Sequence, residues 1–343
     1  MRRLLNTLFV NSEDAYATLE GENVVIRQGE KVAGRFPLHV VEDIYLFSYP
    51  GASPALMGKC AEKGINLVFL TPRGKFLART CGKSQGNVLL RRTQYRAADD
   101  PEQSCRIARN FIFGKISNCR QVVERARRDH AMRIDADKFQ TVSSQLKDIM
   151  SQVLEETSLE SLRGLEGSAA ILYFGVMDDM ILQNKEDFYF RNRNRRPPQD
   201  NVNAMLSYVY VMLSSECASA LEMVGLDSYV GFMHRDRPGR TSLAQDLMEE
   251  LRPCMADRLV LTLINDRVVT DSDFEEQENG AVFLTKNGKK KVQEAWHNKN
   301  ITSITHPFLK EKIEWGLLPY VQALLLSRYL RGDLDGYPPY LWR

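Results

Sequence analysis

The sequence predicts an α+β protein in which an N-terminal β-sandwich-like domain precedes a larger all-α catalytic domain. Short β-favouring runs punctuated by Gly-containing turns fill residues 1–95. From about residue 105 onward, apolar residues recur at the three- and four-residue spacings of helices. A chain of 343 residues is also too long for one ordinary core and fits two domains. We therefore assign residues 1–95 to the β-domain, 96–104 to a linker and 105–343 to the catalytic domain.

The strands predicted in the first domain are short and separated by turn residues. They are expected at residues 15–21, 23–29, 31–38, 41–48 and 65–70, and residues 72–80 are expected to form a turn and a last strand. One helix is expected among them, over residues 53–64. Ser53 would cap it, Pro54 would take its first position, and Gly64 would end it.

The character of the chain changes after this domain. Residues 96–104 are polar and contain a proline, which indicates a linker and a helix start. Residues 107–132 and 139–154 then show helical periodicity, and the helical pattern continues to about Arg331.

Composition narrows the function classes only modestly. The net charge is +2 and the isoelectric point is about 8.1, so nucleic-acid binding has to be argued from clusters of charge. The N-terminus has no signal-peptide pattern, and no window approaches the roughly 20 apolar residues of a membrane helix. The cysteines are scattered without a CxxC pair, which disfavours a structural zinc site. We expect free thiols, a cytoplasmic location and no membrane association.

The most informative segment is residues 231–253, GFMHRDRPGRTSLAQDLMEELRP. His234 lies in a polar loop that precedes a predicted helix. On that helix Asp246, Glu249 and Glu250 are spaced i, i+3 and i+4, which places them on one side. Acids this close repel one another, and a bound cation would offset the repulsion. A solvated acidic helix face and a surface histidine remain the plainer alternatives.

A second acid stands in an apolar setting. On a helical wheel, Glu166 lies near Leu162, Ala169 and Tyr173. A carboxylate on such a face has to be paired, protonated or bound to metal. Pairing with an internal arginine is the plainer alternative to a metal site.

Two basic segments are candidate DNA-binding surfaces. In the first, arginines follow the aromatic run 188–190, a mixture suited to phosphate contact and base stacking. In the second, lysines surround Asn287-Gly288, a turn signal that predicts a basic hairpin. The candidate residues are Arg191, Arg193, Arg195, Arg196, Lys286, Lys289 and Lys290. Ordinary solvated loops are the alternative for both segments.

Three motifs in a fixed order give the chain a family resemblance. LRGLEGSAA is followed by RRPPQDNVNAMLSYVY and then by GFMHRDRPGRTSLAQDLMEELRP. With this order, the chain resembles the family of CRISPR-associated protein one, the integrase-endonuclease of spacer acquisition. The resemblance covers the whole chain and includes the segment FLTKNGKKK. The closing YPPYLWR is similar to the variant found with type I-C systems.

The resemblance implies a site and an activity. Glu166, His234 and Glu249 match the family's metal ligands, and Asp246 matches a nearby catalytic position, with the choice between Asp246 and Glu249 as direct ligand left open. Two carboxylates and an imidazole suit Mg²⁺ or Mn²⁺. The implied reaction joins 3′-hydroxyl ends of short DNA fragments to a CRISPR repeat by transesterification, and water in place of the hydroxyl gives endonuclease activity.

The resemblance also implies partners. They are double-stranded and branched DNA, a second copy of the chain in a homodimer, and a small second CRISPR-adaptation protein. A catalytically silent DNA-binding or scaffolding subunit is the alternative from another class. A metallohydrolase of small substrates fits less well, because no HExxH motif is present and the basic segments would have no purpose.

Overall fold

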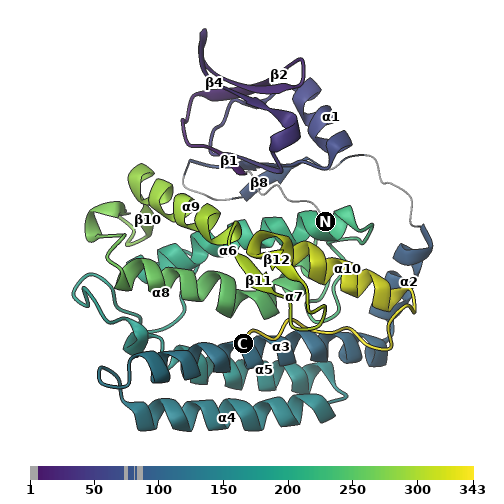
Figure 1. The fold of residues 1–343 in the computed structure, drawn as a ribbon, viewed down its shortest axis with the longest axis vertical. Coiled ribbons are helices and arrows are strands. Elements are labelled where there is room, and N and C mark those ends of the chain that lie inside the picture. The colour runs from purple at the N-terminus through teal and green to yellow at the C-terminus, as the bar shows by residue number, and fades with distance from the viewer. Residues whose placement is uncertain (1–6, 73–75, 81, 83–87) are drawn as a thin grey trace.

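The computed structural model describes residues 7–72, 76–80, 82 and 88–343, and it places the N-terminal domain at one end of the helical domain (Figure 1). The β-domain contains β1 Thr7–Val10, β2 Ala15–Glu20, β3 Asn23–Gln28, β4 Lys31–Pro37, β5 Asp43–Leu46, β6 Gly51–Ala52, α1 Pro54–Lys63, β7 Asn66–Leu70 and β8 Phe76–Arg79.

Two four-stranded sheets form the predicted sandwich. One has the order β4-β3-β2-β6, and the other has the order β1-β5-β7-β8. In the second sheet β1, β5 and β7 run parallel, while β8 pairs antiparallel with β7. Apolar residues of both sheets and of α1 share one core, to which Ile44 and Leu46 contribute from β5.

The β5 strand also belongs to a second core, because successive side chains point to opposite faces of a sheet. Tyr45 on β5 and Phe47 just after it pack with helical residues, as do Val68 and Leu70 of β7. At β5 and β7 this sheet is therefore buried on both faces. The face that carries Tyr45 and Val68 packs on the helical domain, so one apolar cluster continues across both domains.

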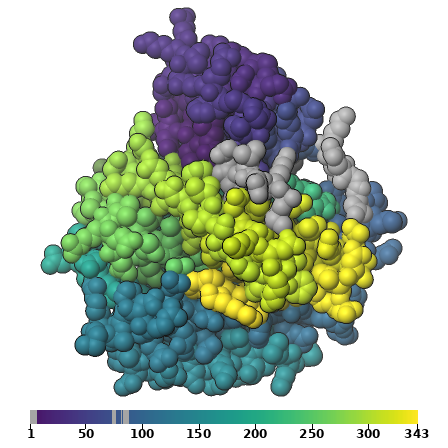
Figure 2. Space-filling view, in the orientation of Figure 1, coloured from purple at the N-terminus to yellow at the C-terminus, as the bar shows by residue number. Residues whose placement is uncertain are grey.

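The second domain is helical apart from two short hairpins (Figure 1). Its elements are α2 Val88–Asp99, α3 Pro101–Asp129, α4 Ala136–Glu155, α5 Leu159–Phe174, α6 Asn201–Met223, α7 Ser242–Leu251, the π-helical η3 Arg252–Asp257, α8 Arg258–Asn265, β9 Phe274–Glu276, β10 Val282–Leu284, α9 Lys286–Asn300, β11 Ser303–Thr305, β12 Lys312–Glu314 and α10 Leu318–Leu330. The C-terminal segment after α10 lies on the face shown in Figure 2, next to the layer formed by α3 and α4.

Local capping signals were predicted well. Ser53 Oγ accepts a hydrogen bond from the Leu56 N–H, Pro54 is the first residue of α1, and Gly64 ends it in a left-handed conformation (φ 69°). Asp200 caps α6 in the same way, because its carboxylate accepts from the Asn203 N–H at 2.7 Å.

The segment expected as a linker is structured differently. Residues 96–99 end α2, and Pro101 begins α3, so only Asp100 of residues 96–104 lies outside a helix. Asp100 is the N-cap of α3, and its carboxylate accepts from the N–H groups of Glu102 and Gln103. The helical region also begins at Val88, inside the range assigned to the β-domain.

Two further expectations concern the environment of the chain. Among the described residues, α6 alone is long and apolar enough to cross a membrane, but 67% of its apolar window is buried inside the fold, as expected of a core helix. The cysteines that the structure describes are free and buried, and Cys81 lies outside the described residues.

A buried acid at the end of η3 gives the fold a pH-sensitive contact. Asp257 is 2% exposed, and it accepts hydrogen bonds from Tyr210 (2.6 Å) and Tyr173 (3.1 Å). Burial raises the pKa of Asp257 from 3.8 to about 6, although both hydroxyl groups act to lower it. The folded chain therefore holds this proton at pH values where the unfolded chain has released it.

We expect Asp257→Asn to weaken the pH dependence of the free energy of unfolding between about pH 4 and pH 6. A folded pKa above the unfolded value stabilises the protein at low pH, and this contribution is lost as the pH rises through about 6. The difference corresponds to about 3 kcal/mol at most. Urea unfolding of both proteins across this range measures it, with the exposed Asp266→Asn as control. Equal pH slopes for the wild type and Asp257→Asn would contradict the assignment.

Candidate active site

Asp246 is the anchor of the candidate site. Its carboxylate is fully buried on α7. Oδ2 accepts from the backbone N–H groups of Phe232 (2.7 Å) and Met233 (3.0 Å), and Oδ1 accepts from the N–H of His234 (3.0 Å). The His234 ring adds a fourth contact, with Nδ1 2.6 Å from Oδ1. One carboxylate thereby holds the loop before α7 in place.

The same contacts orient the imidazole of His234. Because a carboxylate only accepts, Nδ1 carries the proton, and the lone pair of Nε2 is left on the other side of the ring. Nε2 lies 4.0 Å from Glu249 Oε1. The loop backbone is packed tightly here, since a Cβ on Gly231 would lie 2.8 Å from the His234 carbonyl oxygen and 2.9 Å from Asp246 Oδ2. A glycine is therefore required at this close approach.

Glu249 lies at the centre of a charge network and is 2% exposed. Its Oε1 lies 2.6 Å from an Arg252 nitrogen, and its Oε2 lies 2.8 Å from Lys115 Nζ. Burial acts to raise the pKa of Glu249, but the charges of Arg252 and Lys115 outweigh it and lower the pKa to about 2. Glu249 is thus an ionised carboxylate in the interior.

Glu166 joins this network through Lys115. The Glu166 side chain is 25% exposed on α5, and its Oε1 lies 2.5 Å from Lys115 Nζ. The sequence placed Glu166 on an apolar face, with an internal arginine as the alternative to a metal ion. The structure shows Glu166 partly exposed and paired with a lysine. Burial acts to lower the pKa of Lys115, but Glu249 and Glu166 outweigh it and raise the pKa.

Glu250, the third acid of the helix, serves another contact. It is fully buried and accepts hydrogen bonds from Tyr337, from Gln322 (2.9 Å) and from the Tyr340 N–H (2.9 Å). Glu250 therefore fixes the C-terminal segment and does not contribute to the site formed by Asp246 and Glu249.

The structure thus brings the predicted residues into one chain of contacts. Asp246 holds His234, His234 faces Glu249, and Lys115 connects Glu249 to Glu166. As they stand, no three His, Cys, Asp or Glu side chains in the described part of the chain form a group that holds a metal ion. Glu249 Oε2 is buried, and its contact with the protein is the ammonium group of Lys115 at 2.8 Å. The carboxylate oxygens of this donor set, next to an imidazole nitrogen, fit Mg²⁺ or Mn²⁺.

The arginine segment after α5 divides into two kinds of residue. Arg191, Arg195 and Arg196 are exposed. Arg193 instead points inward, where it donates to Asn203 Oδ1 at 2.7 Å and stacks over Tyr210 at 5.2 Å. Its donors are used within the chain, so it is a structural residue.

The lysine segment is not a hairpin. Thr285 caps α9 by accepting from the Gly288 N–H, and this places Lys286, Lys289 and Lys290 in the first turns of a helix. Lys289 is 8% exposed, and its ammonium group contacts the Pro72 carbonyl oxygen. Lys286 and Lys290 remain exposed.

Two groups of residues were not assigned to the site from the sequence. Lys115 stands among buried apolar positions of α3, and a cation on such a face was a usable signal. The loop after His234 contributes more cations. Burial lowers the pKa of Arg240, and the charges of Arg237, Arg195 and Arg196 lower it further. These arginines therefore lie near one another, and we name Arg195, Arg196, Arg237 and Arg240 the arginine cluster.

Fold and site together define a two-domain protein whose helical domain holds a histidine–carboxylate centre beside clustered arginines. The family model for "CRISPR associated protein Cas1" matches residues 8–298, and the chain belongs to this family. It is 47% identical to "CRISPR-associated endonuclease Cas1 2" of Rhodospirillum rubrum, with all of both chains covered.

Two solved structures are similar in fold. A "Casposase bound to integration product" gives a TM-score of 0.84 at 23% identity, covering 99% of this chain and 95% of that chain. A "Cas6-RT-Cas1--Cas2 complex" gives a TM-score of 0.80 at 22% identity, covering 98% of this chain and 36% of that chain. At these identities the likeness shows the fold alone.

We expect Lys115→Met to destabilise the metal-free protein by about 3–5 kcal/mol, because breaking a buried ion pair leaves charge uncompensated. The matched control is Lys59→Met, since Lys59 pairs with Glu22 and Glu62 at the surface. That change should cost little stability, because water screens the surface ion pairs of Lys59. Chemical unfolding in the presence of a chelator measures both variants. Equal losses in the two would show that Lys115 does not neutralise the buried acids.

Proposed function

We propose that this protein is a metal-dependent DNA integrase and endonuclease, which joins the 3′-hydroxyl ends of short DNA fragments to a CRISPR repeat by transesterification. The observation that carries the proposal is the convergence of Glu166, His234 and Glu249 on one network beside the arginine cluster. Membership of the Cas1 family and the name of the Rhodospirillum rubrum relative support it.

The donor set proposed for the metal is Glu166, His234 Nε2 and Glu249. Asp246 is a positioning residue, because its oxygens are taken up by three backbone N–H groups and the His234 ring. When bound, a divalent ion stabilises developing charge at a scissile phosphate and activates the attacking hydroxyl. Without a metal ion, Lys115 already supplies the positive charge that Glu166 and Glu249 need between them.

In the joining step the 3′-oxygen of the incoming DNA forms a bond to a phosphorus of the repeat. The bond from that phosphorus to the 3′-oxygen of the cut repeat strand breaks, so one phosphodiester replaces another. The attacking hydroxyl releases a proton, and the leaving oxygen takes one up. With water as the attacking group, the same exchange hydrolyses the strand.

The proposed substrate is double-stranded and branched DNA. The exposed members of the arginine cluster and Arg191, Lys286 and Lys290 would contact phosphates. A second copy of this chain and a small second CRISPR-adaptation protein are the proposed partners, and the name of the Cas1–Cas2 neighbour supports the latter. We place the protein in the cytoplasm.

The test of this function is a strand-transfer assay with branched DNA, with and without Mg²⁺ or Mn²⁺. We expect joined product only when the metal is present, and none after a chelator is added. A catalytically silent scaffold would bind the same DNA and give no product under either condition.

We expect His234→Ala to lower the rate of strand transfer by about a thousandfold or more, because metal stabilisation of the transition state contributes several kcal/mol. DNA affinity should stay nearly unchanged, since an imidazole bound to metal is neutral and its loss removes no cation that faces the phosphates. Single-turnover rates and filter binding measure the two effects, with the exposed His39→Ala as control. Full strand transfer by folded His234→Ala would falsify the catalytic role.

We expect Arg195→Ala to reduce the slope of log K against log salt by about 1, because one phosphate contact is lost. Arg193→Ala should leave this slope unchanged and instead destabilise the fold by about 1–3 kcal/mol, because its hydrogen bonds are internal. Fluorescence anisotropy at several salt concentrations and urea unfolding measure the pair. The opposite pattern would exchange the roles given to the two arginines.

A further inference from the structure

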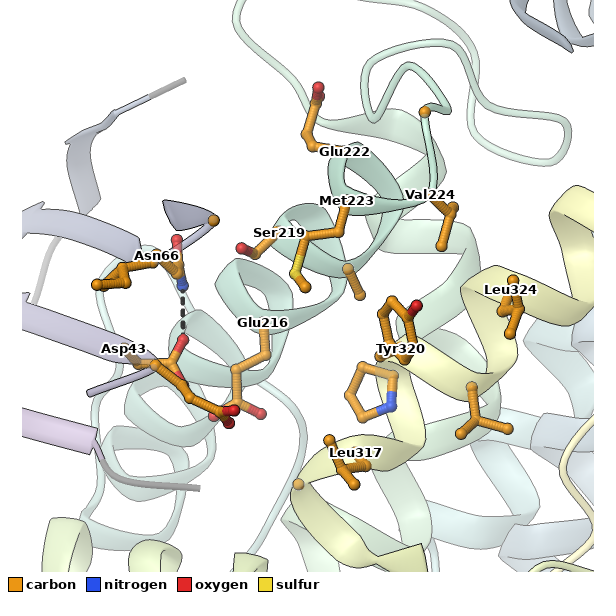
Figure 3. Close-up of a pocket in the computed structure, with 18 of the residues that line it drawn as sticks. Asp43, Asn66, Glu216, Ser219, Glu222, Met223, Val224, Leu317, Tyr320 and Leu324 are labelled. Carbon is orange, nitrogen blue, oxygen red and sulfur yellow. Dashed lines mark hydrogen bonds between the residues drawn. The ribbon is translucent and has the colours of Figure 1, made fainter. Parts of the chain in front are cut away.

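A large cavity lies where the two domains meet, away from the candidate active site. Its volume is about 1430 Å³, and both domains line it. Asp43 and Asn66 come from β5 and β7, whereas Glu216, Ser219 and Tyr320 come from α6 and α10 (Figure 3). None of Glu166, His234, Asp246 or Glu249 lines it.

Two carboxylates from different domains face one another in this cavity. Figure 3 shows Asp43 and Glu216 pointing toward the same space. Asn66 donates to Asp43 Oδ1 at 3.1 Å, and Trp296 donates to Glu216 Oε1 at 2.7 Å. These partners are neutral, and no ion pair is formed by either acid in the part of the chain that the structure describes.

Two oxygen atoms here have no hydrogen-bond partner among the residues that the structure describes. Glu216 Oε2 and Asn300 Oδ1 are both buried without one, on residues that are 8% and 5% exposed. Both residues line the cavity; the Asn300 amide oxygen only accepts, and so does the Glu216 carboxylate when it is ionised. Because buried acceptors in folded proteins are normally satisfied, the two atoms indicate a ligand that supplies donors or positive charge.

The electrostatics of the pair agree with a missing positive charge. Burial raises the pKa of Asp43 to about 6. Burial also raises the pKa of Glu216, and the charge of Asp43 raises it further. A cation between the two carboxylates would remove this penalty, as opposite charges favour the ionised form.

We propose that this cavity binds a hard divalent cation of the Mg²⁺ and Ca²⁺ class, held by Asp43, Glu216 and the Asn300 side-chain oxygen. All three donors are oxygens, which is the set such ions prefer, and water completes their coordination. Because Asp43 belongs to the sheet and Glu216 to α6, the ion connects the two domains. The imidazole of the candidate active site distinguishes that centre from this one.

The test uses terbium, which replaces hard divalent ions and emits when a nearby tryptophan is excited. Trp296 contacts Glu216 directly, so energy transfer reports this cavity. We expect Tb³⁺ emission from the full-length protein to be sensitised through tryptophan and displaced by Ca²⁺. Glu216→Gln and Asp43→Asn should each weaken Tb³⁺ binding by about tenfold or more. Glutamine keeps an acceptor for Trp296, and the second variant lies in the other domain, so a folding defect in one leaves the other informative.

Two controls separate the result from the candidate active site. His234→Ala should leave the tryptophan-sensitised signal unchanged, and so should Glu62→Gln, which alters an exposed acid at the same cavity. Undiminished Tb³⁺ affinity in Glu216→Gln and Asp43→Asn would overturn the proposal. It would also be overturned if the signal disappeared in His234→Ala, or if Ca²⁺ failed to displace Tb³⁺. Any of these three results would indicate that Asp43 and Glu216 share a proton in place of a metal ion.

Discussion

The buried carboxylate of Asp246 is the contact on which the rest of the candidate site depends. Its three backbone contacts fix a loop that has no regular secondary structure, and its fourth contact selects the tautomer of His234. Loop backbone of this kind would otherwise sample many conformations, so the histidine could not be held in place by its own packing. The arginines that follow His234 are carried on the same loop, and their position therefore depends on Asp246 as well.

The negative charge of Glu249 is balanced by cations on the long helix α3 and at the start of η3. Lys115 and Arg252 approach Glu249 from different elements, and together they keep that carboxylate ionised in the interior. The ammonium group of Lys115 lies between Glu166 and Glu249, two acids that need a positive charge close by. A divalent ion at Glu166 and Glu249 would take over the task that Lys115 performs in its absence.

Sequence reasoning succeeded where the physical signal was local. The cap at Ser53 depends on a hydrogen bond within three residues, so residue type and spacing were sufficient to predict it. It failed at Asn287-Gly288, where the turn signal was overridden by the Thr285 cap of α9. Spacing placed Glu250 beside Glu249, yet only tertiary packing with Tyr337 and Gln322 decides where Glu250 points. The same limit applies to Arg193 and Lys115, whose partners lie far away in the chain or in a neighbouring helix.

Segregation of charge explains how a chain with a net charge of +2 could bind the polyanionic substrate that we propose. A nearly neutral protein attracts DNA only where cations are gathered and acids are kept away or neutralised. Here the arginine cluster stands beside His234, while the acids nearest to it are paired with Lys115, Arg252 or backbone N–H groups. Asp43 and Glu216, two acids without an ion pair in the described part of the chain, lie at the junction between the domains, away from this cluster. The local field at the site is consequently more positive than the net charge suggests, and salt should screen it strongly at the exposed arginines.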